Sequence, residues 1–270
     1  MRYTELPPPP SLANIIHCFW FLSSDPGEGD EQPVVADGRL EIILHLAEPF
    51  DVRDTHARWR PQSSALLAGQ LTSPVRIRPA GASDVVGIRF CTDGARSLLA
   101  VPIAELNDRV VPLAELAPHL RDALLVALQH HTTPAGRVRA ITAVLLRHHR
   151  SPPDSAVHNV LRHLDQPHAP SIASVADHLG LTARTVERRV MATTGLTPTE
   201  LRAVLRFRRG YRLLERAPVG QWCRVALSAG YYDQAHCIRE FRRFTGAAPS
   251  QWFSRDTALA DAFLIGKIES

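Results

Sequence analysis

The feature that most constrains the fold of this 270-residue chain is an internal repeat near its C-terminal end. Displaced by 51 residues, the sequence matches itself: Val186 aligns with Cys237, Arg188 with Arg239, Val190 with Phe241, Thr194-Gly195 with Thr245-Gly246, and Pro198 with Pro249. Further upstream the offset is 50, with Val175-Ala176 over Val225-Ala226 and Gly180 over Gly230. Each copy therefore reads as a helix ending at glycine, a short turn, a second helix, and Thr-Gly.

This order of elements predicts a helix-turn-helix in each copy. Gly180 and Gly230 can take the positive φ that often follows a helix. Thr182 and Asp233 stand where the second helix needs an N-cap oxygen. Two tandem copies are a far more specific pattern than one.

The second helix of each copy is amphipathic. At about 100° per residue, one face of the first copy carries Arg184, Arg188 and Met191, with Val186 and Val190 opposite. In the second copy one face carries Ala235, Arg239 and Arg242, with Cys237, Phe241 and Phe244 opposite. An apolar back with an arginine-bearing front suits a helix in a DNA major groove, because arginine can donate two hydrogen bonds to guanine.

A long helix is predicted between the two copies. Thr197-Pro198-Thr199-Glu200 provides an N-cap, a proline at the first helical position and a capping-box glutamate. The helix should run to about Glu215, and its arginines are Arg202, Arg206, Arg208, Arg209 and Arg212. A helix of ~18 residues spans ~27 Å, which could hold two reading helices about one DNA turn (~34 Å) apart.

The distribution of charge agrees with a polyanionic ligand. Residues 151–255 carry a net charge of +7, whereas residues 1–150 carry −1. A basic domain beside a near-neutral one favours nucleic acid as a partner. Arginine richness alone is weak support, since 30 of the 31 basic residues are arginine and this partly reflects a preference for arginine over lysine.

The N-terminal half has a different pattern. Short β-like runs, separated by Gly, Pro and Asp clusters, occupy Ile15–Leu22, Leu40–Leu46, Ser64–Ala68, Pro74–Arg78 and Val85–Cys91. Helical spacing follows in Pro118–Gln129 and Pro134–Arg150, and Ser151-Pro152-Pro153 ends it. We therefore expect a β sandwich or barrel with a helical pair (about 118–149) in residues 1–150, an all-α domain in 151–255, and a tail in 256–270.

Several other classes of protein are disfavoured. No apolar run approaches the ~18–20 residues of a membrane helix, and no signal segment is evident. The four cysteines lie far apart, as is typical of free thiols in a reducing cytoplasm. No phosphate-binding loop, nucleophile elbow, zinc motif or dinucleotide fingerprint occurs. We therefore predict a cytoplasmic protein that is not an enzyme, with no cofactor, no metal and no membrane partner.

Residues from about 157 to 254 resemble the DNA-binding domain of the AraC family of bacterial transcription regulators. The resemblance rests on Ala176, Gly180, Thr182, Arg184, Val186 and Arg188, on the run Gly230-Tyr231-Tyr232-Asp233-Gln234-Ala235-His236, and on Arg239, Phe241, Phe244, Gly246, Pro249 and Trp252. It implies that bases are read by Arg184, Thr185, Glu187, Arg188, Gln234, Ala235, His236 and Arg239. Three positions depart from the family pattern: Val190 and Cys237, where phenylalanine is usual, and Arg189, where an apolar residue is common.

The stretch from Val35 to Ile43 and the later Gly87-Ile88-Arg89-Phe90 look like segments of the β-rich sensory halves of some AraC-type proteins. The resemblance implies a cupin-like barrel used for effector binding, dimerisation or both. Glu41 and Arg89 are the candidate effector contacts, and a structural role for them is at least as compatible with the sequence. The metal-binding His-x-His set of some cupins is absent, because His45 and His56 are isolated.

These observations predict an α+β multidomain protein with an N-terminal cupin-like β barrel or sandwich, a helical pair, and a C-terminal domain with two helix-turn-helix units. Its predicted function is sequence-specific transcription regulation, in which two recognition helices read successive major-groove segments. Phosphate contacts are expected from Arg206, Arg209, Arg242 and Arg243. RNA polymerase, a small-molecule effector and a second copy of the chain stay open as partners.

Two alternatives remain open at this point. One is an enzyme or metal-binding β-barrel protein that uses the helical domain to reach DNA. The other is a protein whose helical repeat serves only as a scaffold for partners, with no salt-sensitive binding to duplex DNA.

Overall fold

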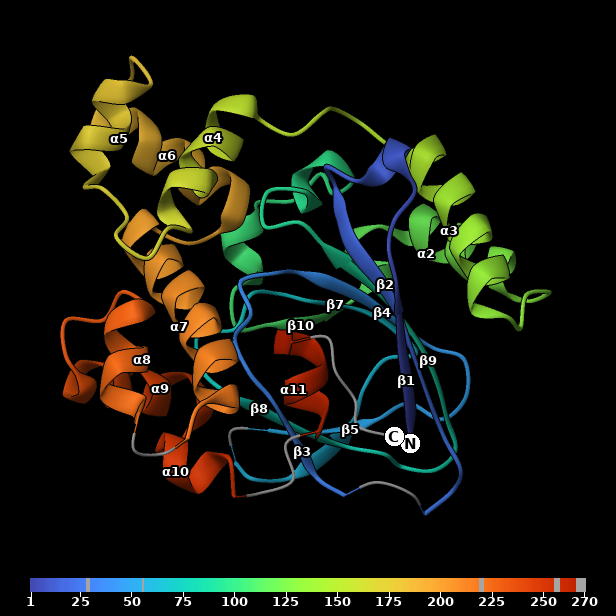
Figure 1. Cartoon of the computed structure of the whole chain (residues 1–270). Coiled ribbons are helices and arrows are strands. Elements are labelled where there is room, and N and C mark those ends of the chain that lie inside the picture. Colours follow the sequence, from blue (N-terminus) through green and yellow to red (C-terminus); the bar gives the residue numbers. More distant parts are fainter. Residues whose placement is uncertain (28–29, 55, 219–220, 255–257, 266–270) are drawn as a thin grey trace.

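The computed structural model describes residues 1–27, 30–54, 56–218, 221–254 and 258–265. Strands dominate the N-terminal part and helices the C-terminal part (Figure 1). The strands are β1 (Arg2–Leu6), β2 (Ile16–Ser24), β3 (Gln32–Val34), β4 (Glu41–His45), β5 (Asp51–Arg53), β6 (Trp59–Pro61), β7 (Ala65–Ala68), β8 (Val75–Arg78), β9 (Ser83–Phe90) and β10 (Val110–Pro112). Short 3₁₀ turns are η1 (Pro10–Leu12), η2 (Ala95–Ser97) and η3 (Ile103–Leu106).

The strands form two antiparallel sheets, one of six strands in the order β1-β2-β9-β4-β7-β10 and one of four in the order β3-β8-β5-β6. Side chains alternate across the six-stranded sheet as strand geometry requires. In β2, Phe19 and Phe21 join a core that includes the N-terminal helices. Trp20 and Leu22 lie on the other face, in a cluster with side chains of the smaller sheet. Each face of the larger sheet is therefore covered.

Three helices cover the outer face of the larger sheet: α1 (Leu113–Leu116), α2 (Pro118–Leu128) and α3 (Pro134–His148). Leu120 and Leu124 of α2 and Ile141 of α3 are at most 3% exposed. Their three- and four-residue spacing places one stripe of each helix against the sheet. The predicted helical pair is present.

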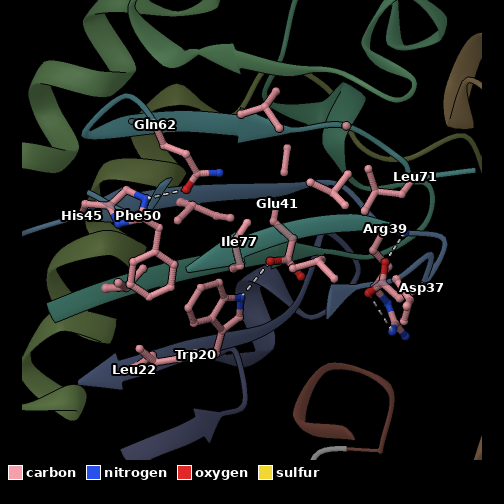
Figure 2. Close-up of a pocket in the computed structure, with 18 residues that line it drawn as sticks. Trp20, Leu22, Asp37, Arg39, Glu41, His45, Phe50, Gln62, Leu71 and Ile77 are labelled. Atoms are coloured by element: carbon pink, nitrogen blue, oxygen red, sulfur yellow. Dashed lines mark hydrogen bonds and ion pairs between the residues drawn. The ribbon is translucent and has the colours of Figure 1, made fainter. Parts of the chain in front are cut away.

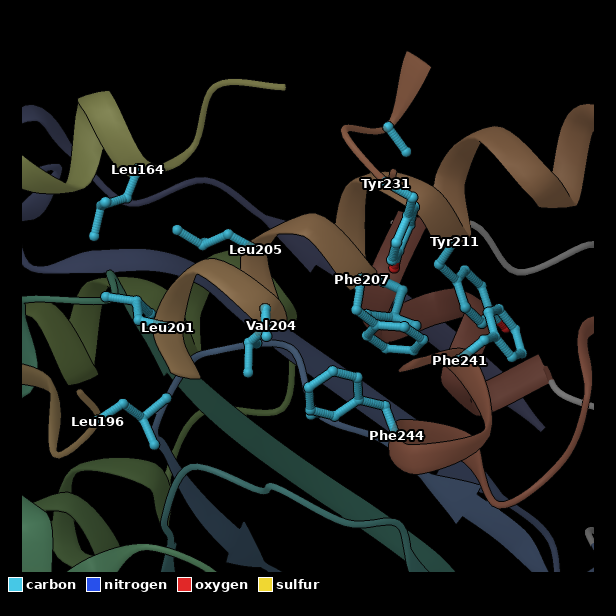
Figure 3. Close-up of a cluster of buried hydrophobic side chains, with 14 of the residues drawn as sticks. Leu164, Leu196, Leu201, Val204, Leu205, Phe207, Tyr211, Tyr231, Phe241 and Phe244 are labelled. Carbon is cyan, nitrogen blue, oxygen red and sulfur yellow. The ribbon is translucent and has the colours of Figure 1, made fainter. Parts of the chain in front are cut away.

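The C-terminal part is helical, with α4 (Ser155–Leu164), α5 (Ile172–His178), α6 (Ala183–Thr194), α7 (Pro198–Arg216), α8 (Trp222–Ser228), α9 (Gln234–Thr245), α10 (Pro249–Trp252) and α11 (Ala258–Ile265). Their apolar side chains converge on α7 (Figure 3). The ring of Phe207 on α7 lies 5.5 Å from that of Phe241 and 4.8 Å from that of Phe244, both on α9. Helix α7 is therefore the buried axis of this region.

The strand-rich and helical parts share apolar contacts. Val35 and Ala36, in the loop after β3, belong to the hydrophobic cluster of the helical part. Gly38 in the same loop has φ of +77°, and a Cβ there would lie 3.1 Å from Val204 of α7. The Arg208 guanidinium of α7 donates to the Asp37 carbonyl at 3.4 Å. Glycine thus permits both the turn and the close approach of the loop to α7.

Helix α11 extends these contacts. It packs against both β3 and α7 (Figure 1). The Tyr211 hydroxyl donates to the Asp261 carboxylate at 2.6 Å, and the Arg212 guanidinium donates to the Leu264 carbonyl at 2.8 Å. This helix falls within the segment expected to be a tail, of which residues 256, 257 and 266–270 lie outside the described residues.

The predicted fold class is confirmed: an α+β chain with two facing β sheets, a helical pair, and helices that form two helix-turn-helix units. Among the described residues, no helix combines the length and the apolar character needed to cross a bilayer.

Candidate DNA-binding surface

The first helix-turn-helix unit consists of α5 and α6. Gly180 follows α5 with φ of +66°, the left-handed conformation that ends many helices. The Thr182 side chain then accepts a hydrogen bond from the Thr185 amide at 3.2 Å and caps α6. Both predicted turn residues therefore occupy their expected positions.

The second unit, α8 and α9, repeats this geometry. Gly230 has φ of +91° and follows α8. The Asp233 carboxylate accepts a hydrogen bond from the His236 amide at 2.6 Å and caps α9. Threonine and aspartate thus perform the same capping at equivalent positions of the repeat.

The ends of the two second helices also match. The buried Thr194 hydroxyl donates to the Val190 carbonyl at 2.9 Å, and the buried Thr245 hydroxyl donates to the Phe241 carbonyl at 2.8 Å. Gly195 and Gly246 follow with φ of +77° and +79°. A threonine that satisfies a buried carbonyl, followed by a left-handed glycine, explains why Thr-Gly recurs in both copies.

The helical backs are buried as predicted. Val186 and Val190 of α6 are 1% and 0% exposed. On α9, Cys237, Phe241 and Phe244 are at most 3% exposed. On the opposite faces Arg184 and Arg188 of α6 and Arg239 and Arg242 of α9 are exposed, whereas Met191 of α6 is half-buried.

The eight residues predicted to read bases all lie on α6 or α9. Six are exposed: Arg184, Glu187, Arg188, Gln234, Ala235 and Arg239. Thr185 and His236 are half-buried, and both contact their own turn. The Thr185 and Thr182 hydroxyls are hydrogen-bonded at 2.9 Å, and the Tyr232 amide donates to Nδ1 of His236 at 3.5 Å.

The residues predicted to contact phosphates fall into two groups. Arg242 and Arg243, at the end of α9, are exposed. Arg206 and Arg209 of α7 instead bind within the protein. Arg206 forms a bidentate ion pair with Glu240, and Arg209 donates to the Ala229 carbonyl at 3.0 Å and to the Asp165 carbonyl at 2.8 Å. Their contact with phosphate remains a prediction.

Helix α7 sets the separation of the units. It begins at the predicted capping box, in which Thr197 and Glu200 exchange hydrogen bonds between side chain and backbone. Its 19 residues span about 28 Å at 1.5 Å per residue. Arg189, which departs from the family pattern, points outward from α6 and lies 3.7 Å from Asp154 at the start of α4.

Sequence reasoning missed the contact between α6 and the strand-rich part. The Asn107 side chain donates to the Gly195 carbonyl just beyond the end of α6. The Arg96 guanidinium donates to the Ala192 carbonyl at 3.4 Å. Residues 99–104 and the side chain of Arg188 line the two sides of one open groove. No local pattern in the sequence could have paired these distant segments.

The two candidate effector residues occupy different environments. Glu41 lines a narrow cavity of about 80 Å³ between the sheets, beside Trp20, Phe50 and Ile77 (Figure 2). Arg89 is 1% exposed and does not reach this cavity; it pairs with Glu41 and, at 3.1 Å, with Glu5. Burial alone would lower the pKa of Arg89, but Glu41 and Asp37 hold it well above its ordinary value. Arg89 therefore keeps its charge.

His45 and Gln62 supply further polar groups to the cavity. Nε2 of His45 lies 3.2 Å from Oε1 of Gln62 (Figure 2). Burial lowers the pKa of His45 to about 4, so this imidazole is neutral at pH 7. Within the described part of the chain, no three His, Cys, Asp or Glu side chains cluster in a way that could hold a metal ion.

Comparison with known proteins gives two family matches. A family model described as a helix-turn-helix domain matches residues 175–255, and a domain of unknown function (DUF6597) matches residues 4–112. No curated protein matches the chain.

Among the solved structures that are similar to this chain, three differ in how much of it they cover. ToxT from Vibrio cholerae strain SCE256, bound to an unsaturated fatty acid, is 12% identical over 93% of this chain and 98% of its own, with a TM-score of 0.47. A DNA-binding transcriptional dual regulator from Escherichia coli K-12 is 20% identical over 38% and 99%, with a TM-score of 0.33. The DNA-binding domain of AdpA in complex with a target DNA is 25% identical over 37% and 86%, with a TM-score of 0.32.

The assignment rests on the family model together with the geometry of the two units. The matched segment contains most of α5 and all of the helices from α6 to α10. The chain is thus a DNA-binding transcription regulator that carries an AraC-type helix-turn-helix domain behind an N-terminal domain of unknown function.

Proposed function

We propose that this regulator reads two successive major-groove segments of one duplex, one with α6 and one with α9. Helix α7 acts as the rigid spacer between them, and its length of about 28 Å suits segments about one helical turn apart. In this proposal residues 151–255 form the DNA-binding domain and residues 1–150 the regulatory domain.

The observation that carries this proposal is the duplicated geometry of the two second helices. Each is capped at both ends in the same way, buries an apolar back, and leaves its arginine-bearing front exposed. Arg188 and Arg239 occupy equivalent positions of the repeat. A helix face whose role is only to be solvated does not require two copies with equivalent exposed arginines and equivalent caps.

The proposed roles follow from exposure and chemistry. Base edges are read by Arg184, Thr185, Glu187 and Arg188 of α6, and by Gln234, Ala235, His236 and Arg239 of α9. Exposed Arg242 and Arg243, in the last turn of α9, are the proposed phosphate contacts. Phosphate contacts fix the register of a protein on DNA, whereas base contacts supply the sequence preference.

We further propose that the cavity between the sheets holds a small effector and that the protein catalyses no reaction. The cavity wall is mainly apolar, and its polar groups are Asp37, Arg39, Glu41, His45 and Gln62. Such a wall suits a small apolar molecule that carries a hydrogen-bond donor for Glu41. A second copy of the chain and RNA polymerase are the remaining proposed partners.

Selection of bound duplexes from a random pool by the full-length protein tests the proposal. We expect an enriched site with two short conserved segments about one helical turn apart, and binding that weakens steeply as salt rises. Enrichment of a single segment would contradict reading by two helices. Stoichiometric zinc or iron in the purified protein would instead favour the enzyme alternative.

A further inference from the structure

Arg206 and Glu240 join the spacer helix to the second recognition helix. The Arg206 side chain is 17% exposed and that of Glu240 is 9% exposed. Nε of Arg206 donates to Oε1 of Glu240 at 3.0 Å, and its Nη2 donates to Oε2. A two-point contact of this kind fixes both the distance and the relative orientation of the groups, which a single charge–charge contact does not.

Two further residues complete this network. The Arg206 guanidinium lies over the ring of Tyr231, with its Cζ 5.1 Å from the ring centroid. The rings of Tyr231 and His236 are perpendicular, with a centroid distance of 5.3 Å. Nε2 of His236 lies 3.8 Å from the nearer carboxylate oxygen of Glu240. Nδ1 accepts from the Tyr232 amide, so the Nε2 proton faces Glu240.

The orientation of His236 thus depends on groups that Arg206 holds in place. His236 lies in the first turn of α9, where recognition helices contact base edges. Its side chain is 33% exposed, so part of the ring is available to a ligand. A displacement of Glu240 or Tyr231 would remove contacts that the His236 ring makes.

The same contacts oppose a direct phosphate contact by Arg206. A phosphate that took the Nε and Nη2 donors of Arg206 would break the ion pair and leave the Glu240 carboxylate buried without its partner, which is strongly unfavourable. Arg242 and Arg243 are exposed on the same recognition helix and need no such rearrangement. The repeat adds a second argument, because Arg189 occupies the position equivalent to Glu240 and points outward toward Asp154. The network therefore belongs to the second unit alone.

We propose that Arg206 and Glu240 are positioning residues: they orient α9 and the His236 ring, and so set base preference in the second segment without contacting DNA. This inference rests on the proposed function, since it requires that α9 reads bases.

The test uses the full-length protein and four single variants: Arg206→Lys, Glu240→Gln, His236→Ala and, as a control on the same helix as Arg206, exposed Arg216→Lys. Each is used for selection from a random duplex pool and for affinity measurements at several salt concentrations. The segment read by α9 is defined independently as the one whose preference Arg239→Ala relaxes.

For Arg206→Lys and Glu240→Gln we expect a roughly tenfold or greater loss of base preference in that segment, comparable to losing one good base contact. The segment read by α6 should be unchanged, which also reports that the domain is folded. The salt dependence should keep its slope, because no phosphate contact is lost. His236→Ala should relax the same base pairs, and Arg216→Lys should bind as the wild type does.

Opposite results would overturn the inference. If Arg206→Lys behaves as the wild type, a point charge is sufficient and a phosphate contact explains the residue. If Glu240→Gln strengthens binding, the carboxylate acts only by repelling DNA. If His236→Ala leaves the base preference intact, the His236 ring does not read bases and the network has no base-reading side chain to orient. This variant tests the inference even where the other two fail to fold. A wild-type protein with no sequence preference would instead refute the proposed function.

Discussion

Helices α6 and α9 begin and end with the same capping contacts, yet each is held by a different part of the molecule. The end of α6 contacts the strand-rich part through Asn107 and Arg96. Helix α9 is tied to α7 through the ion pair of Arg206 and Glu240. Duplication therefore preserved the local turn chemistry while the long-range supports diverged. The first unit is hydrogen-bonded to the strand-rich part, and the second is ion-paired with the spacer helix.

Truncation of the buried side chains on the backs of α6 and α9 should give the largest difference in unfolding free energy. Phe241 and Val190 are equivalent in the repeat and are 1% and 0% exposed. Phe241→Ala should cost about 4 kcal/mol of unfolding free energy because it leaves a large cavity. Val190→Ala removes less apolar volume and should cost about 2 kcal/mol. Urea titration of both variants measures this difference, and equal losses would show that the two backs pack alike.

The glycines that end α6 and α9, Gly195 and Gly246, have the same backbone conformation but different surroundings. Alanine in the left-handed conformation costs about 1–2 kcal/mol, and Gly246→Ala should lose only that, since the nearest atom to its Cβ is 3.6 Å away. At Gly195 the new Cβ would lie 2.7 Å from Oδ1 of Asn107 and 3.0 Å from the Ile103 carbonyl. Gly195→Ala should therefore lose roughly 1 kcal/mol more. Thermal unfolding of the pair tests this, and an equal loss would argue against the contact with Asn107.

The two equivalent arginines should control different base pairs. Arg188→Ala and Arg239→Ala should each cost about 1–3 kcal/mol of binding free energy and relax one position of the site. Arg224 on α8 is exposed and serves as a matched control, since its loss should leave base preference unchanged. Titration with single-base variants of the selected duplex measures the effects. If both variants relaxed the same position, the helices would not read separate segments.

The smallest effect should follow the loss of one interdomain hydrogen bond. Asn107→Ala removes the donor to the Gly195 carbonyl and should cost about 1 kcal/mol. Amide hydrogen exchange should then become faster in α6 and stay unchanged in α9. Arg109→Ala, on the same segment but directed at the Glu105 carbonyl, is the control. Faster exchange in both helices would mean that the two units are not separately supported.

Local chemistry explains how much of the fold could be predicted from the sequence. Thr182, Asp233 and the capping box at Thr197 act within a few residues, so the sequence indicates them directly. The five predicted strand segments and both N-terminal helices are present. Strands β3, β5, β6 and β10 were missed because each has three residues, too few to display an alternating pattern. Strand β1 was missed beside the proline run that follows it.

The parts of the candidate site that the sequence could not indicate are the pairings between distant segments. A helical wheel groups Arg206 and Arg209 with other arginines of α7, but it cannot say which neighbouring helix each one meets. Glu240 lies 34 residues from Arg206 along the chain, and Asn107 lies 88 residues from Gly195. Such contacts depend on the packing of whole helices, which only the tertiary structure provides.

The insertion of Val35 and Ala36 into the hydrophobic cluster of the helices has a consequence for how the molecule unfolds. The two halves bury apolar surface against each other. Unfolding of either half would therefore expose apolar surface on the other and lower its free energy of unfolding. Heating should therefore melt the halves cooperatively. Cleavage of the chain at the connecting Ser151-Pro152-Pro153 segment would leave complementary apolar surfaces exposed on both fragments. Burial of these surfaces would favour reassociation of the fragments.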